Sequence, residues 1–226
     1  NPAPPIDNVT AIRRIAARAD SEFARGDFTT PIPIRSRLTT SPAQVPVTFE
    51  VMAHTGDSSL TQPGVPRGFR RTGLMRTQTM PVYLRFEPLM TRTIPRAWLI
   101  PAADTAAIAL LRAHDILVER PTSGMTSARV SRFFIDSLHT EQREFQGHHE
   151  TSLAGSWRDT TAQIPVDMLI VRGDQLQAVA ALCLLDPESD DGLVTWNVFD
   201  AELAPGKTFP VCRLPAPAVA SPLCAS

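Results

Sequence analysis

Residues 96–120 read RAWLIPAADTAAIALLRAHDILVER and carry the clearest secondary-structure pattern in the chain. The run Arg92–Ile100 has strand composition and is followed by a proline. Asp104 can begin a helix over Thr105–Ala113, and Ile116–Arg120 again has strand composition. Three apolar side chains would share the inner face of that helix, namely Ala107, Ile108 and Leu111. The pattern predicts a strand–helix–strand unit whose strands run parallel through a right-handed crossover.

The segment before this unit mixes helix, strand and loop signals. Residues 8–25 have apolar side chains at helical spacing and predict an N-terminal helix. Residues 28–38 and 45–51 alternate like strands. Residues 54–79 are rich in Gly, Pro, Thr, Ser and Arg, and we expect a long irregular loop there. We therefore assign residues 1–79 to an N-terminal region of helix, strand and loop.

The segment after this unit is dominated by short strands and turns. Period-two patterns at 128–138, 151–158, 164–171 and 209–214 predict strands, and 175–185 predicts a short helix. We expect residues 80–214 to form one β-rich accessory domain and the Pro-, Ala- and Ser-rich residues 215–226 a disordered tail. The fold class is α+β, mainly β, with β-sandwich-like sheets, the embedded strand–helix–strand unit and the N-terminal helix.

Composition narrows the classes of function. The 226 residues include 22 basic and 23 acidic side chains, so nothing in the net charge of −1 favours nucleic acid as a partner. No apolar run approaches the roughly 18 residues of a membrane span. Proline, at 21 residues, favours turns and short strands. Cys212 and Cys224 could close a disulfide in an oxidising compartment or remain two free thiols.

Catalytic motifs give little support to an enzyme. The sequence has no Gly-x-Ser-x-Gly elbow, no phosphate-binding glycine motif and no His-Glu-x-x-His zinc motif. His139, His148 and Glu150 could ligate a metal ion, which would make the chain a small metal-dependent hydrolase. The alternative is a polar strand or turn, since neighbours along a strand point to opposite faces.

Several segments together resemble the C-terminal, post-catalytic region of large bacterial zinc carboxypeptidase-like proteins of the carboxypeptidase A type. The resemblance covers about residues 80–214, and more weakly 8–60. It rests on four runs: Pro95–Pro101 with Leu110–Arg120, Arg143–His148, Leu184–Asp200 and Phe209–Leu214. Asp115 stands where the family pattern has glycine.

The resemblance implies that the chain is not itself the peptidase. The family's zinc ligands, catalytic glutamate and substrate-binding arginines lie in a domain N-terminal to the matched region, so none maps onto this chain. We expect no cofactor here, zinc only in the absent catalytic domain, and that domain or another protein surface as partner. The start at Asn1-Pro-Ala-Pro-Pro, without a methionine, fits a piece of a longer protein. We expect a secreted or periplasmic bacterial location.

Charged residues beside an aromatic side chain define the candidate binding surface. Its members are Arg143, Glu144, His148, Asp190, Asp191, Trp196 and Asp200. The competing interpretation is a buried Trp196 among turn-forming aspartates, with a positive φ at Gly192. A different function, a free-standing secreted module that binds carbohydrate or peptide, would need an exposed Trp98, Trp157 or Trp196. Three buried tryptophans would count against it.

Overall fold

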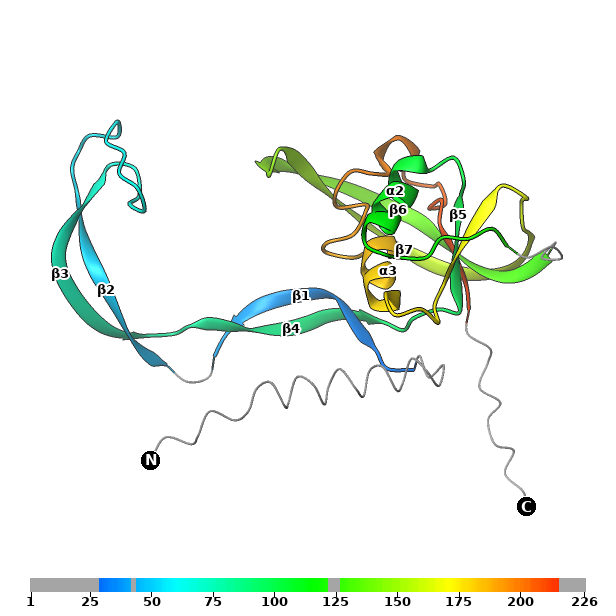
Figure 1. Cartoon of the computed structure of the whole chain (residues 1–226), viewed down its shortest axis with the longest axis horizontal. Coiled ribbons are helices and arrows are strands. Elements are labelled where there is room, and N and C mark those ends of the chain that lie inside the picture. The colour runs from blue at the N-terminus through cyan, green and yellow to red at the C-terminus, as the bar shows by residue number, and fades with distance from the viewer. Residues whose placement is uncertain (1–28, 42–43, 122–126, 216–226) are drawn as a thin grey trace, which may run out of the picture. The chain divides into compact units, whose positions relative to one another are not determined.

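The computed structural model describes residues 29–41, 44–121 and 127–215 (Figure 1). The expected helix at 8–25, Cys224 and all but the first residue of the expected tail lie outside the described residues. The chain divides into two compact units, one formed by residues 37–87 and the other by the residues on either side of that segment. The sequence-based boundaries at 79 and 214 remain predictions about folding domains. No helix in the described ranges is long and apolar enough to cross a membrane.

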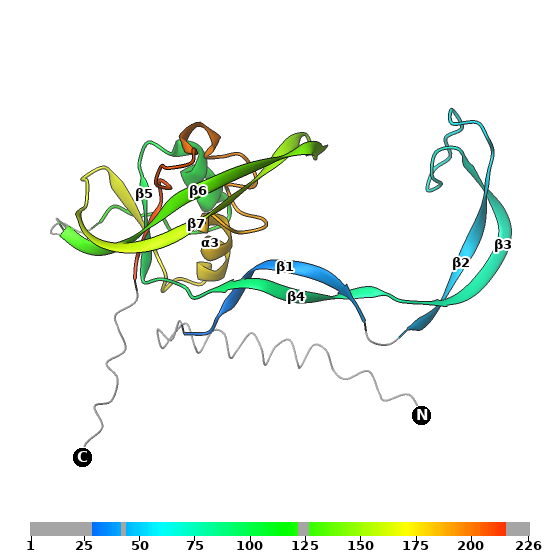
Figure 2. The ribbon, with the colours of Figure 1, turned by 180° about the vertical axis from the view of Figure 1, so that it is seen from behind.

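A five-stranded antiparallel sheet forms the centre of the larger unit. Its order is β7-β6-β9-β5-β8, so strands distant in sequence lie side by side (Figures 1 and 2). The strands are β5 (Ala97–Pro101), β6 (Ser127–Phe145), β7 (His148–Gln163), β8 (Met168–Arg172) and β9 (Cys212–Leu214). Strands β6 and β7 make a long hairpin that turns at Gln146 and Gly147, both with positive φ. Phe145 and His148, on either side of its turn, belong to the candidate functional site.

Two helices pack with the sheet around one hydrophobic core. They are α2 (Thr105–Ala113) and α3 (Ala178–Leu185), and a 3-10 turn at Asp200–Glu202 follows. Trp98 and Ile100 of β5 point into this main core, whereas Ala97 and Leu99 belong to a smaller apolar cluster. This alternation is what a strand buried on both faces requires. The prediction of an α+β, mainly β fold is therefore confirmed.

The predicted strand–helix–strand unit is only partly correct. Helix α2 has the predicted bounds, and its three predicted inward residues are buried. Residues 116–120 do not form a regular strand, because only Glu119 makes a bridge, antiparallel to Ile170 of β8. The Gln175 side chain bonds the backbone of Leu117, with Oε1 accepting its N–H at 2.7 Å, and so replaces part of the missing ladder. The strands paired with β5 are β8 and β9, both antiparallel to it and both much later in the chain, so the predicted parallel crossover is wrong.

Two-stranded ribbons make up the remaining β-structure. Strand β1 (Ile32–Thr40) pairs with β4 (Tyr83–Arg92), and β2 (Val45–His54) pairs with β3 (Phe69–Met80). The expectation of a loop throughout 54–79 is wrong, since its second half is β3, antiparallel to β2. The side chains of β3 are almost all exposed. Without a buried face, the strand needs no apolar alternation, and so its sequence lacks the signal on which the prediction relied.

Asp104, at the beginning of α2, gives a pH-dependent prediction. Burial, and then the charge of Glu202, raise its pKa from 3.8 to about 6, and its side chain makes no capping hydrogen bond. The folded state therefore binds this proton more tightly than the unfolded state. Between about pH 4 and pH 6 the free energy of unfolding falls as pH rises, and it stays low above pH 6. Because the residue is half-buried, we expect Asp104→Asn to stabilise the protein by about 1 kcal/mol at pH 8 and hardly at all at pH 4.

Thermal unfolding at pH 4, 5, 6 and 8 would measure this effect. Glu202→Gln removes the smaller cause and should give a gain of the same sign but lower size. A gain from Asp104→Asn that is equal at all four pH values would contradict the assignment.

Candidate functional site

A buried ion cluster anchors the turn that follows α3. Asp186 ends the helix with no exposed surface, and one carboxylate oxygen, Oδ1, accepts the N–H of Glu188 at 2.9 Å. The other oxygen receives a hydrogen bond from Arg213 of β9 and lies 3.7 Å from Arg92 Nε. Arg92 also pairs with Glu188 at 2.5 Å. Two arginines and two carboxylates thus tie β4, β9 and the turn together.

Arg213 is also deeply buried, with 9% of its surface exposed. Its guanidinium lies 3.8 Å from the centre of the Trp157 ring, and that ring packs edge-on against Phe133. Burial lowers the pKa of Arg213, and the charge of Asp186 opposes this shift. Burial also raises the pKa of Glu188, an effect that Arg92 opposes. Asp186, Glu188 and Arg213 are almost fully buried, Arg92 is 24% exposed, and the two positive charges balance the two negative ones.

The two neighbouring aspartates of the turn point to different partners. Asp190 pairs with Arg35 Nε at 3.1 Å and accepts the N–H of Ser36 at 2.8 Å. Asp191 accepts a hydrogen bond from Trp196 Nε1 at 2.5 Å. Gly192 does not have the expected positive φ. A Cβ there would lie 2.9 Å from the Cys183 carbonyl oxygen, so close backbone packing explains the glycine.

Three aromatic side chains, which we call the aromatic patch, gather where this turn meets the β6–β7 hairpin. Trp196 stacks on His148 with ring centres 4.4 Å apart and an interplanar angle of 27°, and Phe145 lies 6.5 Å from the same imidazole. Trp196 is 40% exposed and Phe145 is 47% exposed. An exposed stack of this kind offers apolar area at a low loss of side-chain entropy on binding.

Asn197 holds the His148 ring of the aromatic patch in place through a hydrogen bond. Its backbone has φ 63°, and its amide oxygen lies 2.9 Å from His148 Nδ1. The amide nitrogen donates to Thr151 Oγ1 and to Asp200 Oδ2, each at 3.0 Å. A positive φ is tolerated better by Asn than by most residues. Sequence reasoning did not single out Asn197, although its place next to Trp196 in a turn-rich stretch was a usable signal.

The structure brings together some of the predicted binding residues and separates others. His148, Asp191, Trp196 and Asp200 lie in one connected set of contacts through Asn197. Asp190 lies outside this set and forms an ion pair with Arg35. Arg143 and Glu144 are exposed on β6, and their side chains form no hydrogen bond or ion pair with any described residue.

The tryptophans differ sharply in exposure. Trp98 is fully buried, and Trp157 is partly buried against Arg213. Trp196 is the exposed one, so the interpretation of a buried Trp196 is wrong.

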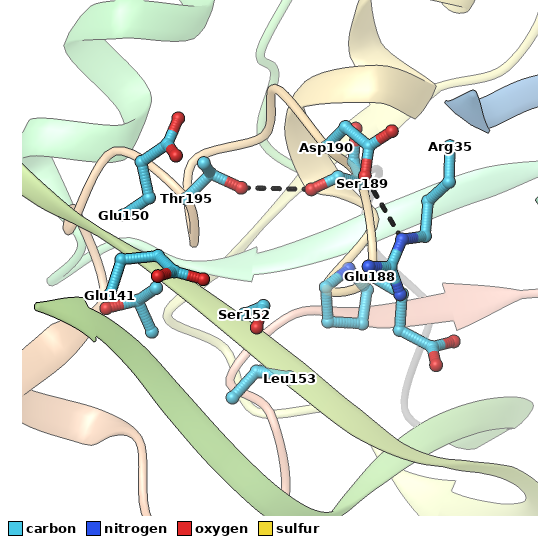
Figure 3. Close-up of a pocket in the computed structure, with 11 residues that line it drawn as sticks. Arg35, Glu141, Glu150, Ser152, Leu153, Glu188, Ser189, Asp190 and Thr195 are labelled. Atoms are coloured by element: carbon cyan, nitrogen blue, oxygen red, sulfur yellow. Dashed lines mark hydrogen bonds and ion pairs between the residues drawn. The ribbon is translucent and has the colours of Figure 1, made fainter. Parts of the chain in front are cut away.

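An acidic cleft of about 160 Å³ is lined by residues of β6, β7 and the turn after α3 (Figure 3). Two of its lining residues, Glu150 and Thr195, are close in sequence to His148 and Trp196 of the aromatic patch. Glu141 and Glu150 stand on one side, and Arg35, Glu188 and Asp190 stand on the other. Two further lining residues contact each other: the Thr195 hydroxyl donates a hydrogen bond to the Ser189 carbonyl oxygen at 3.0 Å. Carboxylates arranged in this way favour a cationic group of a partner. Glu141 and Arg35 were not predicted, because nothing local in the sequence connects strands β6 and β1.

The proposed metal ligands do not converge. His139 Nε2 lies 3.3 Å from Glu141 Oε1, His148 stacks on Trp196, and Glu150 lines the acidic cleft. Within the described ranges no group of three or more His, Cys, Asp or Glu side chains is placed to hold a metal ion. The three-ligand hypothesis therefore finds no support in the geometry.

Comparison with known proteins gives one relative. Carboxypeptidase 2 of Trichophyton rubrum is 22% identical over 128 residues, which are 57% of this chain and 23% of the fungal protein. The chain thus matches less than a quarter of the length of that relative. No protein-family model and no solved structure matches. The similarity supports a carboxypeptidase-like relationship for this β-rich chain.

Proposed function

We propose that the chain is a non-catalytic, C-terminal accessory module of a zinc carboxypeptidase-like protein, which packs on its catalytic domain and modulates it. The similarity to a carboxypeptidase over 128 residues carries this proposal. In this proposal the zinc belongs to the catalytic domain, and both parts are secreted or periplasmic in a bacterium. The partner of the module is that domain rather than nucleic acid or lipid.

The aromatic patch is the docking surface in this proposal. Hot spots of protein interfaces are enriched in Trp, sit in apolar surroundings and carry most of the binding energy. Trp196 meets this description because its ring is held in place by His148 and Asp191 before any partner binds. Such preorganisation reduces the entropy lost on association. The carboxylates of the acidic cleft would then select a basic rim on the partner.

Replacing Trp196 by Ala should weaken binding to the catalytic domain. Truncating an aromatic hot spot costs about 2 kcal/mol, which corresponds to roughly 30-fold in Kd. Titration calorimetry with the catalytic domain, expressed as a separate chain, would measure the change. Leu176→Ala is the matched control, since Leu176 is 75% exposed and lies outside the aromatic patch. Equal Kd values for Trp196→Ala and the wild type would remove the patch from the interface.

The exposed Trp196 also favours the alternative of a free-standing module for carbohydrate or peptide. An aromatic face can stack on a sugar ring, but one face of Trp196 is already stacked on His148. Binding to an oligosaccharide or peptide array that is lost in Trp196→Ala, without binding to the catalytic domain, would favour this alternative.

A further inference from the structure

A second cleft, which we call the α2 cleft, opens along one face of helix α2. It has a volume of about 330 Å³, which is in the range of small-molecule pockets. Helix residues three and four positions apart form one wall, and Ala102, Leu169 and residues 118–120 form the rest. The helix residues are Thr105, Ile108, Ala109 and Arg112.

The floor of the α2 cleft is apolar. Ile108 is 6% exposed and Leu169 is 9% exposed, so both side chains are part of the core and are held rigidly. Val118 and Ala102 are partly buried against the same core cluster. An apolar group that enters would therefore meet a preformed surface, and no buried side chain would have to move.

Two arginines line the same cleft. Arg112 stands in the last turn of α2, and Arg120 stands on the facing segment. Neither side chain forms a hydrogen bond or ion pair with another described residue. Glu119 is the one acidic residue that lines the cleft. Its charge also interacts with Arg172: Asp174 is the main cause that raises the pKa of Arg172, and Glu119 contributes a smaller part. The cleft therefore combines an apolar floor with an excess of positive charge.

We propose that the α2 cleft binds an aliphatic carboxylate, a ligand that joins one carboxylate to a branched apolar group of about five carbons. Guanidinium groups recognise carboxylates through paired N–H donors, and two of them can neutralise and orient one anion. The aliphatic part fills the space over Ile108, Leu169 and Val118. The carboxylate can come from a free acid or from the last residue of a peptide. This site is independent of the aromatic patch and of the proposed role in a peptidase.

Titration followed by amide NMR would test the α2 cleft with three probes: 4-methylpentanoate, N-acetyl-leucine and the uncharged 4-methylpentanamide. We expect the two acids to bind with Kd of roughly 1 mM and to shift amides of residues 105–113 and 118–120. The amide should bind at least about tenfold more weakly, because it lacks the charge that the guanidinium groups recognise. Tighter binding of N-acetyl-leucine would identify a peptide end as the ligand, and equal binding would identify a free acid.

Arg112→Gln and Arg120→Gln should each weaken the binding of 4-methylpentanoate about tenfold. Arg96→Gln is the control, since Arg96 is exposed and lies outside the α2 cleft. The thermal midpoints of all three variants should match the wild type, because these side chains form no ion pair with a described residue. Equal binding of the acid and its amide, unchanged affinity in both variants, or no amide shifts in the cleft would each overturn the proposal.

Discussion

We expect Asp186→Asn to lower the free energy of unfolding by about 3–5 kcal/mol, because it leaves Arg92 and Arg213 with Glu188 as the one remaining carboxylate of a mostly buried cluster. Asp186 has no exposed surface, and Arg213 is only 9% exposed. In the variant, the buried guanidinium of Arg213 has lost its carboxylate partner and has too little exposed surface for water to replace it. The substitution keeps the shape of the side chain, so the change measures charge rather than packing.

Urea unfolding followed by tryptophan fluorescence would measure this loss. Asp174→Asn is the matched control, since it breaks the ion pair with Arg172 at the surface, where both side chains are about half exposed. Such pairs contribute about 0–1 kcal/mol. Equal losses for Asp186→Asn and Asp174→Asn would show that the cluster does not stabilise the fold as described.

Gly155→Ala should be almost as damaging, for a purely steric reason. A Cβ on Gly155 would lie 2.1 Å from the Phe134 carbonyl oxygen and 2.7 Å from Cζ of Phe133. The carbonyl is part of the β6–β7 ladder, and Phe133 is fully buried, so neither can move freely. Overpacking of a core costs about 1–3 kcal/mol, and contact with backbone places this site at or above about 3 kcal/mol.

Differential scanning calorimetry would measure the drop in the thermal midpoint. Ser156→Ala, the next residue on β7, is the control and should change stability by less than about 0.5 kcal/mol. A Gly155→Ala protein that melts within a degree or two of the wild type would refute the steric argument.

Local sequence pattern predicted the elements that bury one face. Helix α2 was predicted with its exact bounds because Ala107, Ile108 and Leu111 repeat at helical spacing around a single apolar side. Strand β3 was missed because its exposed side chains carry no such repeat. The position of β8 beside β5 was missed because pairing over long sequence distances leaves no local trace.

The candidate site was predictable to a similar extent. Asp191, Trp196 and Asp200 lie close in sequence, whereas His148 stacks on Trp196 from the beginning of β7. The partners that come from afar were not predictable. Arg35 reaches Asp190 across 155 residues, and Arg213 reaches Asp186 from the last strand.

We propose that this chain docks on a carboxypeptidase catalytic domain through the aromatic patch. Amide hydrogen exchange of the chain, alone and mixed with that domain, tests the claim without any substitution. We expect slower exchange in the complex for residues 145–151 and 191–200, with residues 45–80 unchanged. Unaltered exchange at 145–151 and 191–200 in the presence of the domain would contradict it.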